Sequence, residues 1–322
     1  ANGKLHQGWM MAKKADEIAA YSAGEVLQKM STVLPIFASN ESPATRVAIQ
    51  KVLVEASKVL PQLLSGAADL TGNTGAKLTG EGAFSASHPE GKQVYYGIRE
   101  HAMGSIANGM ALHGMVLPVV GTFFVFADYM RPALRLAALS KAKVVFIFSH
   151  DSVGVGEDGP THQPVEQLAS LRIIPGLQVI RPCDGNETSA AWMQALAFDG
   201  PTALILSRQN LPIISDGSAV QTGAAIIRSV DQPDLVLMGT GSEVAVCLEA
   251  AEILASRGIS ANVVSAPCFS LFDSQPADFK AKVLPHDIPI VGVEAGVSFG
   301  WERYVDDMVS IESFGTSAPG AQ

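Results

Sequence analysis

The chain has few cysteines, few charged residues and no long apolar run, and these shortages exclude several classes of protein. Its three cysteines, Cys183, Cys247 and Cys268, are scattered and odd in number, so they form neither a disulfide framework nor a zinc-binding pattern. No apolar segment is long enough to span a bilayer, and the opening ANGKLHQGWMM lacks the apolar core of a signal peptide. We therefore expect a cytoplasmic protein with no membrane partner.

Basic residues are also scarce. Lysine and arginine number 22 against 31 aspartates and glutamates, which gives a net charge of −9 at pH 7. This balance argues against nucleic acid or an anionic membrane as a partner, although a phosphorylated small molecule needs only a local basic pocket. The 322 residues, 48% of them hydrophobic, are enough for about two globular domains.

Apolar runs alternate with amphipathic stretches, a pattern typical of parallel sheets covered by helices. Buried strands are predicted at Leu63–Ala67, Val116–Gly121, Lys143–Ser149, Leu177–Arg181, Ala203–Ser207, Leu235–Gly239, Ala261–Ala266 and Ile288–Glu294. Helices are predicted at Thr45–Leu60, Arg99–His113, Ala127–Leu139, Glu187–Phe198 and Glu243–Arg257. We expect an α/β fold with two parallel or mostly parallel sheets flanked by helices.

A short turn-rich segment, NLPIISDGSAVQT, separates the chain into two parts. We expect one domain at residues 43–216 and a second at residues 217–322. Residues 1–42 look like a connector with one helix, Lys13–Met30. Because the sequence does not begin with methionine, we do not expect residue 1 to be the natural start.

The stretch GVGEDG, starting at Gly154, matches the glycine fingerprint of dinucleotide-binding enzymes. It follows a predicted strand, and Asp184 follows the next strand, roughly where a ribose-binding carboxylate belongs. The fingerprint needs a helix that begins within its glycines, whereas here a long loop follows and two prolines bracket it. Glu157 and Asp158 would also repel a pyrophosphate. We therefore favour another role for this loop.

The same loop carries an unusual density of titratable groups. His150, Glu157, Asp158 and His162 occur within thirteen residues, after a central strand. Open α/β sheets bind ligands at the carboxyl ends of their strands, and loops there carry much of a protein's chemistry. A solvated surface loop remains the alternative, but this density at this position favours a catalytic loop.

The string HDSVGVGEDGPTHQPVEQLASLR resembles the signature loop of the transketolase family. SGAADL, YGIREHAMGSIANGM, GTFFVFADYMR and GPTALILSRQN agree with the family in order and spacing, and GTGSEV and VEAGVSFGWERY resemble its last domain. The similarity covers roughly residues 43–320. It implies a thiamine-diphosphate enzyme that moves a two-carbon ketol unit between sugar phosphates.

Family members have a diphosphate-binding domain, a pyrimidine-binding domain and a C-terminal domain, and this chain resembles the second and third. The first domain contributes a GDG motif, which does not occur here. The resemblance therefore implies that Mg²⁺ or Ca²⁺ and the cofactor's diphosphate are held by the missing domain, with no metal ligand in this chain. It also implies a homodimer, or pairing with a separate diphosphate-binding chain.

The resemblance also assigns residues to the cofactor. Glu100, in YGIREH, takes the place of the catalytic carboxyl that hydrogen-bonds the cofactor's aminopyrimidine. Phe123 and Phe126 take the place of aromatic rings that pack against the pyrimidine, and Phe126 matches the stacking position best. Tyr129 and Asp69 complete the expected cofactor-binding set, whereas Phe124 is expected only in the core.

A second set of residues is assigned to the substrate. Arg46, His150 and Arg208 resemble the substrate phosphate site, and Asp158 resembles the carboxylate that contacts a sugar hydroxyl. His162 is expected beside cofactor and substrate as a catalytic proton carrier. The family usually has a hydroxyl side chain where Asn73 stands, so either Asn73 or Thr74 takes that role.

Alternative functions remain open. Dihydroxyacetone synthase and the β subunit of a 2-oxo acid dehydrogenase belong to the same superfamily. The EDGPTHQP loop and SRQN favour the sugar-phosphate enzyme, but they discriminate less well against dihydroxyacetone synthase. The chain could instead be a non-catalytic fragment or subunit that acts mainly in dimer assembly. We expect the isolated chain to be inactive without the missing domain.

Overall fold

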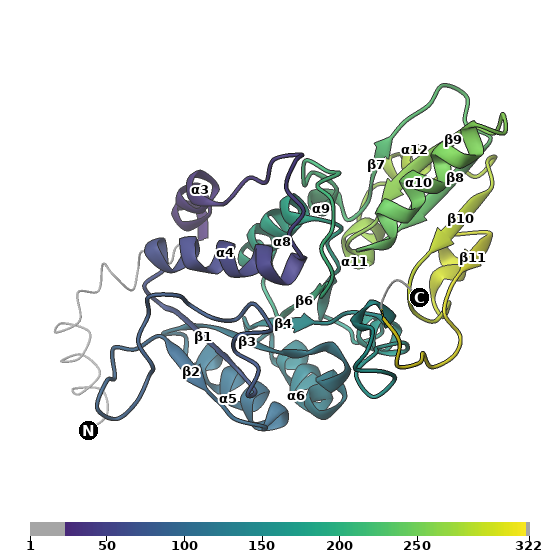
Figure 1. The fold of residues 1–322 in the computed structure, drawn as a ribbon. Coiled ribbons are helices and arrows are strands. Elements are labelled where there is room, and N and C mark those ends of the chain that lie inside the picture. The colour runs from purple at the N-terminus through teal and green to yellow at the C-terminus, as the bar shows by residue number, and fades with distance from the viewer. Residues whose placement is uncertain (1–22, 320–322) are drawn as a thin grey trace.

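Two β-sheets, one in each half of the chain, organise the computed structural model, which describes residues 23–319 (Figure 1). The first sheet is fully parallel, with the strand order β2-β1-β3-β4-β6-β5. Its strands are β1 (Leu63–Ala67), β2 (Gln93–Tyr95), β3 (Leu117–Phe123), β4 (Val145–Ser149), β5 (Gln178–Ile180) and β6 (Thr202–Leu206).

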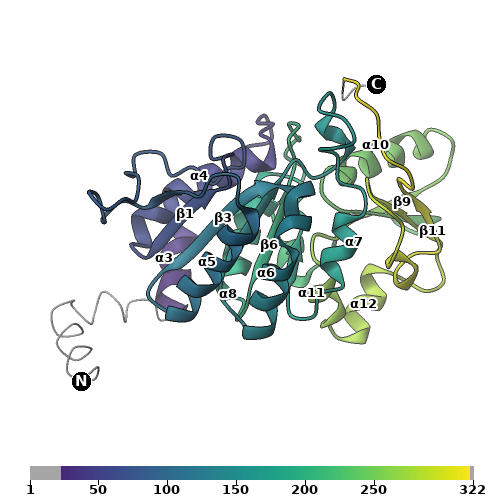
Figure 2. The same cartoon turned by 90° about the horizontal axis from the view of Figure 1, so that it is seen from below.

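Helices cover both faces of this sheet because its central strands are apolar on both sides. Figures 1 and 2 show α3, α4 and α8 on one face and α5 and α6 on the other. In β3, Val119 packs into the first of these layers and Val120 into the second. The helices of this half are α3 (Ala23–Val33), α4 (Thr45–Val59), α5 (Glu100–His113), α6 (Ala127–Ser140), α7 (Gln167–Arg172), α8 (Gly185–Ala197) and α9 (Ala219–Thr222).

The second sheet has the order β11-β10-β8-β9-β7, and its edge strand β7 runs antiparallel to β9 while the other pairs are parallel. Its strands are β7 (Ala225–Arg228), β8 (Leu235–Gly239), β9 (Ala261–Ser265), β10 (Ile290–Val293) and β11 (Asp307–Val309). The helix α10 (Glu243–Ala255) packs on one face, and α11 (Phe269–Asp273) and α12 (Ala277–Val283) pack on the other. The predicted α/β fold with mostly parallel sheets is confirmed.

Each predicted strand has a counterpart in the structure, and the strands that were not predicted are short. No strand was predicted at β2, β7 or β11, which have three or four residues each. The predicted helix Lys13–Met30 lies partly outside the described residues, and α3 continues to Val33. Between residues 23 and 319, none of the helices has both the length and the apolar character needed to cross a bilayer.

Candidate active site

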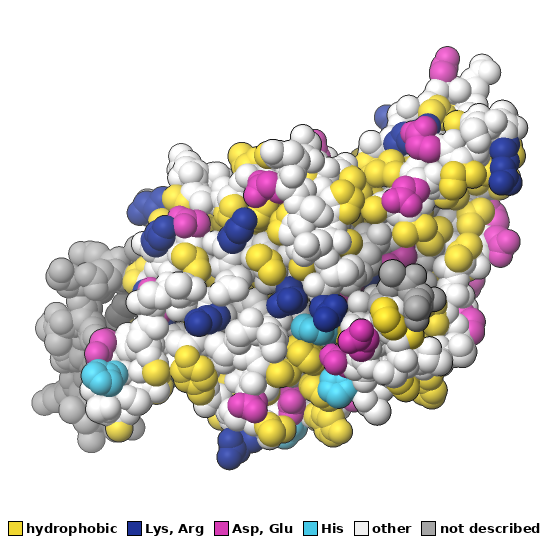
Figure 3. All heavy atoms as spheres, viewed as in Figure 1, with side chains coloured by type: hydrophobic (Ala, Val, Ile, Leu, Met, Phe, Trp, Pro, Cys, Tyr) yellow, Lys and Arg dark blue, Asp and Glu magenta, His cyan; other side chains and the backbone are white. Residues whose placement is uncertain are grey.

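The predicted site residues follow the carboxyl ends of neighbouring strands in the first sheet. Phe123 ends β3, and His150 comes directly after β4. Asp69 follows β1 and Arg208 follows β6. Because parallel strands end at one edge, residues far apart in sequence reach the same side of the sheet. Figure 3 shows basic, acidic and histidine side chains next to one another near the middle of this face of the molecule.

A cluster of rings lies at this edge. The rings of Phe123 and Phe126 are nearly parallel, at 7°, with centroids 6.2 Å apart. The His150 ring stacks on Phe123 with centroids 3.7 Å apart, and His162 meets Phe126 edge-on at 5.5 Å. Tyr129 lies 6.0 Å from Phe126 and is 67% exposed. The structure therefore brings five predicted residues together, and together they present flat apolar surface beside two imidazoles.

His150 is held in an unusual backbone conformation, with a φ of 63° that non-glycine residues seldom adopt. Its ring is buried, and Nδ1 lies 2.9 Å from the Ser149 hydroxyl. Burial, together with the nearby charges of Arg46, Arg208 and His162, lowers the pKa of His150 to about 3, and burial is the largest of these effects. The ring is therefore neutral at physiological pH and contributes a hydrogen-bonding group in place of a charge.

Two guanidinium groups accompany this neutral histidine. Burial lowers the pKa of Arg46, and the charge of Arg208 lowers it further. Arg46 donates to the Asn73 carbonyl oxygen at 3.2 Å, but its buried Nε has no hydrogen-bond partner in the described part of the chain. Neither arginine forms a salt bridge with any carboxylate between residues 23 and 319. Paired cations without a counter-charge make a local anion site on an acidic protein.

The structure distinguishes Asn73 from Thr74, the two candidates for the position where the family usually has a hydroxyl side chain. The Thr74 side chain is fully buried, and its hydroxyl donates to the Leu70 carbonyl oxygen at 3.1 Å. The Asn73 side chain is exposed, while its carbonyl oxygen accepts from Arg46. Asn73 is therefore the residue whose side chain is free to meet a ligand next to Arg46.

Glu100 begins α5 and is 8% exposed. Among the described residues, its carboxylate has no hydrogen-bond partner, and no hydrogen bond or ring contact joins Glu100, Asp69 or Asp158 to the ring cluster. A carboxylate at a helix N-terminus is favoured by the helix dipole, so its position alone does not require a ligand. Phe124, in contrast, is fully buried in the core, as expected.

The loop after β4 does not have the geometry of a dinucleotide site. It contains one short 3₁₀ turn, Val153–Val155, and the next helix, α7, begins only at Gln167. Asp184 is fully buried at the N-terminus of α8, where it accepts hydrogen bonds from the backbone of Glu187, Ile214 and Ser215. It is therefore a helix cap in this structure, with no freedom to bind a ribose.

Sequence reasoning missed two groups that shape the site. Ser149 contacts His150 and lies 3.5 Å from the Asn73 carbonyl oxygen, so it links two of the predicted residues. A serine that ends the apolar run VVFIFS could have been noticed as a polar group at a strand end. Thr122, at the end of β3, has a buried hydroxyl without a partner among the described residues.

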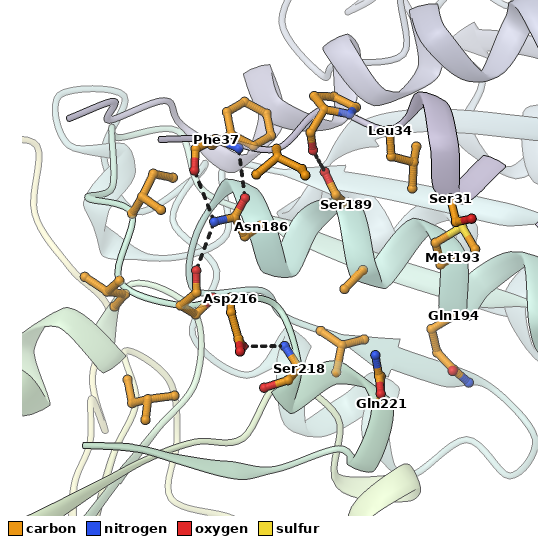
Figure 4. Close-up of a pocket in the computed structure, with 18 of the residues that line it drawn as sticks. Ser31, Leu34, Phe37, Asn186, Ser189, Met193, Gln194, Asp216, Ser218 and Gln221 are labelled. Carbon is orange, nitrogen blue, oxygen red and sulfur yellow. Dashed lines mark hydrogen bonds between the residues drawn. The ribbon is translucent and has the colours of Figure 1, made fainter. Parts of the chain in front are cut away.

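A hollow with a volume of about 1000 Å³ lies elsewhere, between α3, α8, α9 and β7 (Figure 4). Its polar side chains are largely used within the protein: Asn186 pairs with the Phe37 backbone, and Ser189 donates to Pro35. No group of three or more histidine, cysteine, aspartate or glutamate side chains within residues 23–319 is arranged to hold a metal ion. The described residues thus offer aromatic, basic and imidazole groups to a ligand.

The fold and the side chains at the carboxyl edge of its first sheet define an α/β protein with a candidate ligand site at that edge. The sequence pattern described as the transketolase pyrimidine-binding domain matches residues 41–213, and that of the transketolase-like C-terminal domain matches residues 223–322. The chain belongs to the transketolase family.

Relatives named transketolase match this chain over part of their own length. That of Halalkalibacterium halodurans is 47% identical over 308 residues, which is 92% of this chain and 46% of the relative. That of Aquifex aeolicus is 48% identical, over 87% of this chain and 42% of the relative. The chain therefore spans about half the length of these relatives.

Solved structures include both a relative of about twice this length and one of similar length. Transketolase from Leishmania mexicana superposes with a TM-score of 0.93 at 42% identity, over 99% of this chain and 48% of that one. A split-gene transketolase described as an inactive β4 tetramer superposes with a TM-score of 0.71 at 26% identity, over 87% of this chain and 92% of that one. The second relative is a chain whose extent corresponds to that of this chain.

Proposed function

We propose that this chain forms the pyrimidine-binding part (residues 43–216) and C-terminal part (residues 217–322) of a cytoplasmic transketolase. The reaction is the transfer of a two-carbon ketol unit between sugar phosphates with thiamine diphosphate. One observation carries the proposal: two arginines that form no salt bridge among residues 23–319, and a neutral histidine, lie beside a stack of aromatic rings. This combination suits a phosphorylated substrate next to a flat aromatic cofactor.

The residues present fit the aminopyrimidine half of thiamine diphosphate. Phe126 offers a ring face for stacking, and Glu100 offers a carboxyl group without a partner in the described chain. The bound cofactor supplies a carbon nucleophile that carries the ketol unit. In our proposal Glu100 holds a hydrogen bond to the aminopyrimidine, Phe123 and Phe126 exclude water, and Tyr129 and Asp69 line the same pocket.

The substrate role falls to the second set of residues. Arg46 and Arg208 bind the phosphate with their planar guanidinium groups, and the neutral His150 and the Asn73 amide add hydrogen bonds. Asp158 is exposed on the loop after β4, where it can accept a hydrogen bond from a sugar hydroxyl. His162 lies edge-on to Phe126 and moves protons at the substrate oxygen, as suits an imidazole near neutral pH.

The diphosphate and its Mg²⁺ or Ca²⁺ need groups beyond the described residues. We propose that another part of a longer chain, or a separate diphosphate-binding chain, supplies them. The inactive β4 tetramer formed by the split-gene relative supports inactivity of this chain by itself. It also supports the second candidate function, in which the isolated chain acts mainly in self-assembly.

Self-assembly is further supported by apolar side chains around α5 and α6. Ile98, Leu112, Tyr129 and Leu139 are all more than half exposed, at 78%, 60%, 67% and 71%. Large exposed apolar groups concentrated on one pair of helices are typical of a protein interface. We propose that this face joins two copies of the chain in a homodimer.

The phosphate assignment can be tested on the chain as it stands. Ribose 5-phosphate and ribose are titrated by NMR into the chain, into Arg208→Gln, and into Arg135→Gln as a control on the exposed side of α6. We expect binding of the phosphorylated sugar only, about tenfold weaker in Arg208→Gln and unchanged in Arg135→Gln. Equal binding of ribose, or no effect of Arg208→Gln, would refute the phosphate site.

The family reaction is tested by adding a diphosphate-binding half from a relative, with thiamine diphosphate and Mg²⁺. Ketol transfer to ribose 5-phosphate is expected in the mixture and absent from either half alone. Transfer to formaldehyde in its place would identify a dihydroxyacetone synthase. Turnover by the single chain with micromolar cofactor binding would show that its cofactor site is already complete.

A further inference from the structure

Arg181, the residue after β5, is a fully buried cation between the two domains that the proposed chemistry does not use. Its Nε donates to Oδ2 of Asp151 at 2.9 Å. Its Nη1 donates to the carbonyl and hydroxyl oxygens of Thr240, both at 3.0 Å, and to the carboxylate of Glu243. One guanidinium group therefore connects the loop after β4 to the start of α10 in the second domain.

The second domain is shaped around this side chain. Gly241, between Thr240 and Glu243, has a φ of 53°, and a Cβ there would lie 2.7 Å from the Arg181 Nε. The backbone closes the same contact, because Arg181 donates to the Pro267 carbonyl oxygen and accepts from the Gly241 amide. The GTGSEV motif thus surrounds a charge that comes from the first domain.

The other end of this connection reaches the site. Asp151 follows His150 directly, and its buried carboxylate has Arg181 as its ion-pair partner, while Oδ1 has no hydrogen-bond partner among the described residues. Removing the only counter-charge of a buried carboxylate is strongly unfavourable, so the backbone at Asp151 is tied to Arg181. The left-handed conformation of His150 requires such an external restraint, since the residue does not favour it by itself.

We propose that Arg181 is a positioning residue for His150, acting through Asp151. The seating of the second domain on the first thereby fixes the imidazole against Phe123 and next to Arg46. The effect on phosphate binding rests on the proposed function. The placement of His150 by Arg181 and Asp151 does not depend on it.

A neighbouring ion pair provides a matched control. Arg172, the last residue of α7, forms two hydrogen bonds of 2.7 Å with Glu294 at the end of β10. This pair crosses the same domain boundary and is also largely buried. Glu294 also accepts from the Thr240 hydroxyl, which is a partner of Arg181, but no hydrogen bond or ion pair among residues 23–319 joins Arg172 or Glu294 to Asp151. A general loosening of the domains is therefore separable from loss of the Asp151 restraint.

The test is NMR of the chain with ¹³C-labelled histidine, in which the Phe123 ring shifts the Hε1 signal of His150. In Asp151→Ala, Arg181 keeps Glu243, so the domains stay paired while the loop is released. We expect this variant to lose the ring-current shift and to bind inorganic phosphate about tenfold more weakly. Asp151→Asn, whose amide oxygen still accepts from Nε, is expected to restore most of both.

Two further variants complete the experiment. Arg181→Lys keeps the charge but lacks the planar fork that contacts Asp151, Thr240 and Glu243 together, so it is expected to lose the shift even if Asp151→Ala does not fold. Arg172→Gln is expected to lower the denaturation midpoint and leave the His150 signal in place. An unchanged signal in Asp151→Ala and Arg181→Lys, or an equal change in Arg172→Gln, overturns the inference. If the signal moves as expected while phosphate binding stays constant, the positioning stands and the proposed phosphate role of His150 fails.

Discussion

Glu187, in the first turn of α8, is a buried carboxyl group at the domain boundary whose titration should be visible in the stability of the protein. The Ser265 hydroxyl, at the end of β9, donates to it at 2.6 Å, and the Cys183 amide donates at 2.8 Å. The pKa of Glu187 is raised from 4.5 to about 7. Burial is the largest cause and the nearby charge of Asp184 acts in the same direction, and together they outweigh the hydrogen bonds from Ser265 and Cys183, which lower the pKa.

The sign of the effect follows from proton linkage. Between pH 4.5 and about 7 the unfolded chain has released this proton while the folded chain retains it. The free energy of unfolding therefore falls as pH rises through this window and does not change further, through this group, above it. The loss corresponds to about 3 kcal/mol over the whole window.

Glu187→Gln removes the titration and keeps the contacts, because the amide can accept from Cys183 and donate to Ser265. In urea denaturation at pH 5, 6, 7 and 8, the variant should gain about 2–3 kcal/mol relative to the parent chain between the lowest and highest pH. Glu249→Gln, at an exposed position of α10, removes the same charge without burial and should show a constant difference. A constant difference for Glu187→Gln as well would refute the reasoning.

Three further predictions concern assembly, chemistry and fold. The chain should form a homodimer whose interface buries well over ~1,000 Å². Analytical ultracentrifugation at tens of micromolar chain should therefore show a dimer, and a monomer alone would contradict this prediction. In the assembled enzyme, Glu100→Gln should reduce kcat far more than cofactor affinity, so unchanged C2 proton exchange of thiamine diphosphate would argue against the assignment. Gly241→Ala should destabilise the chain by at least about 1–3 kcal/mol, because φ is 53° and a Cβ would meet Arg181; an unchanged midpoint in urea would count against that packing.

The fold was largely predictable because its central strands are short, apolar runs that the sequence displays directly. Val145–Ser149 and Thr202–Leu206 are buried at every position, so no alternation was needed to recognise them. The edge strand Ala225–Arg228 is only partly buried and pairs antiparallel, so its identity depends on a distant partner. Patterns along the chain do not reveal such partners.

The residues of the candidate site were predictable from motifs, but most of their contacts were not. The ring cluster of Phe123, Phe126 and His162 followed from family motifs, and the geometry adds that His150 stacks on Phe123. The roles of all the predicted site residues stay predictions, and for Glu100, Asp69 and Asp158 no contact in the described chain connects them to the cluster. Arg181 escaped notice because a lone arginine after a strand is usually a surface charge, and its partners lie up to 62 residues away in sequence.

The shared cation at the domain boundary has a consequence for how such proteins can be recombined. Thr240, Gly241 and Glu243 belong to one domain and Asp151 and Arg181 to the other, so neither domain contains the whole contact. A hybrid assembled from the two halves of different relatives inherits compatible chemistry only if both parents use the same cation and the same glycine. Sequence identity across the remaining surface is then a poor guide to which hybrids will fold, and these five positions are the ones to compare first.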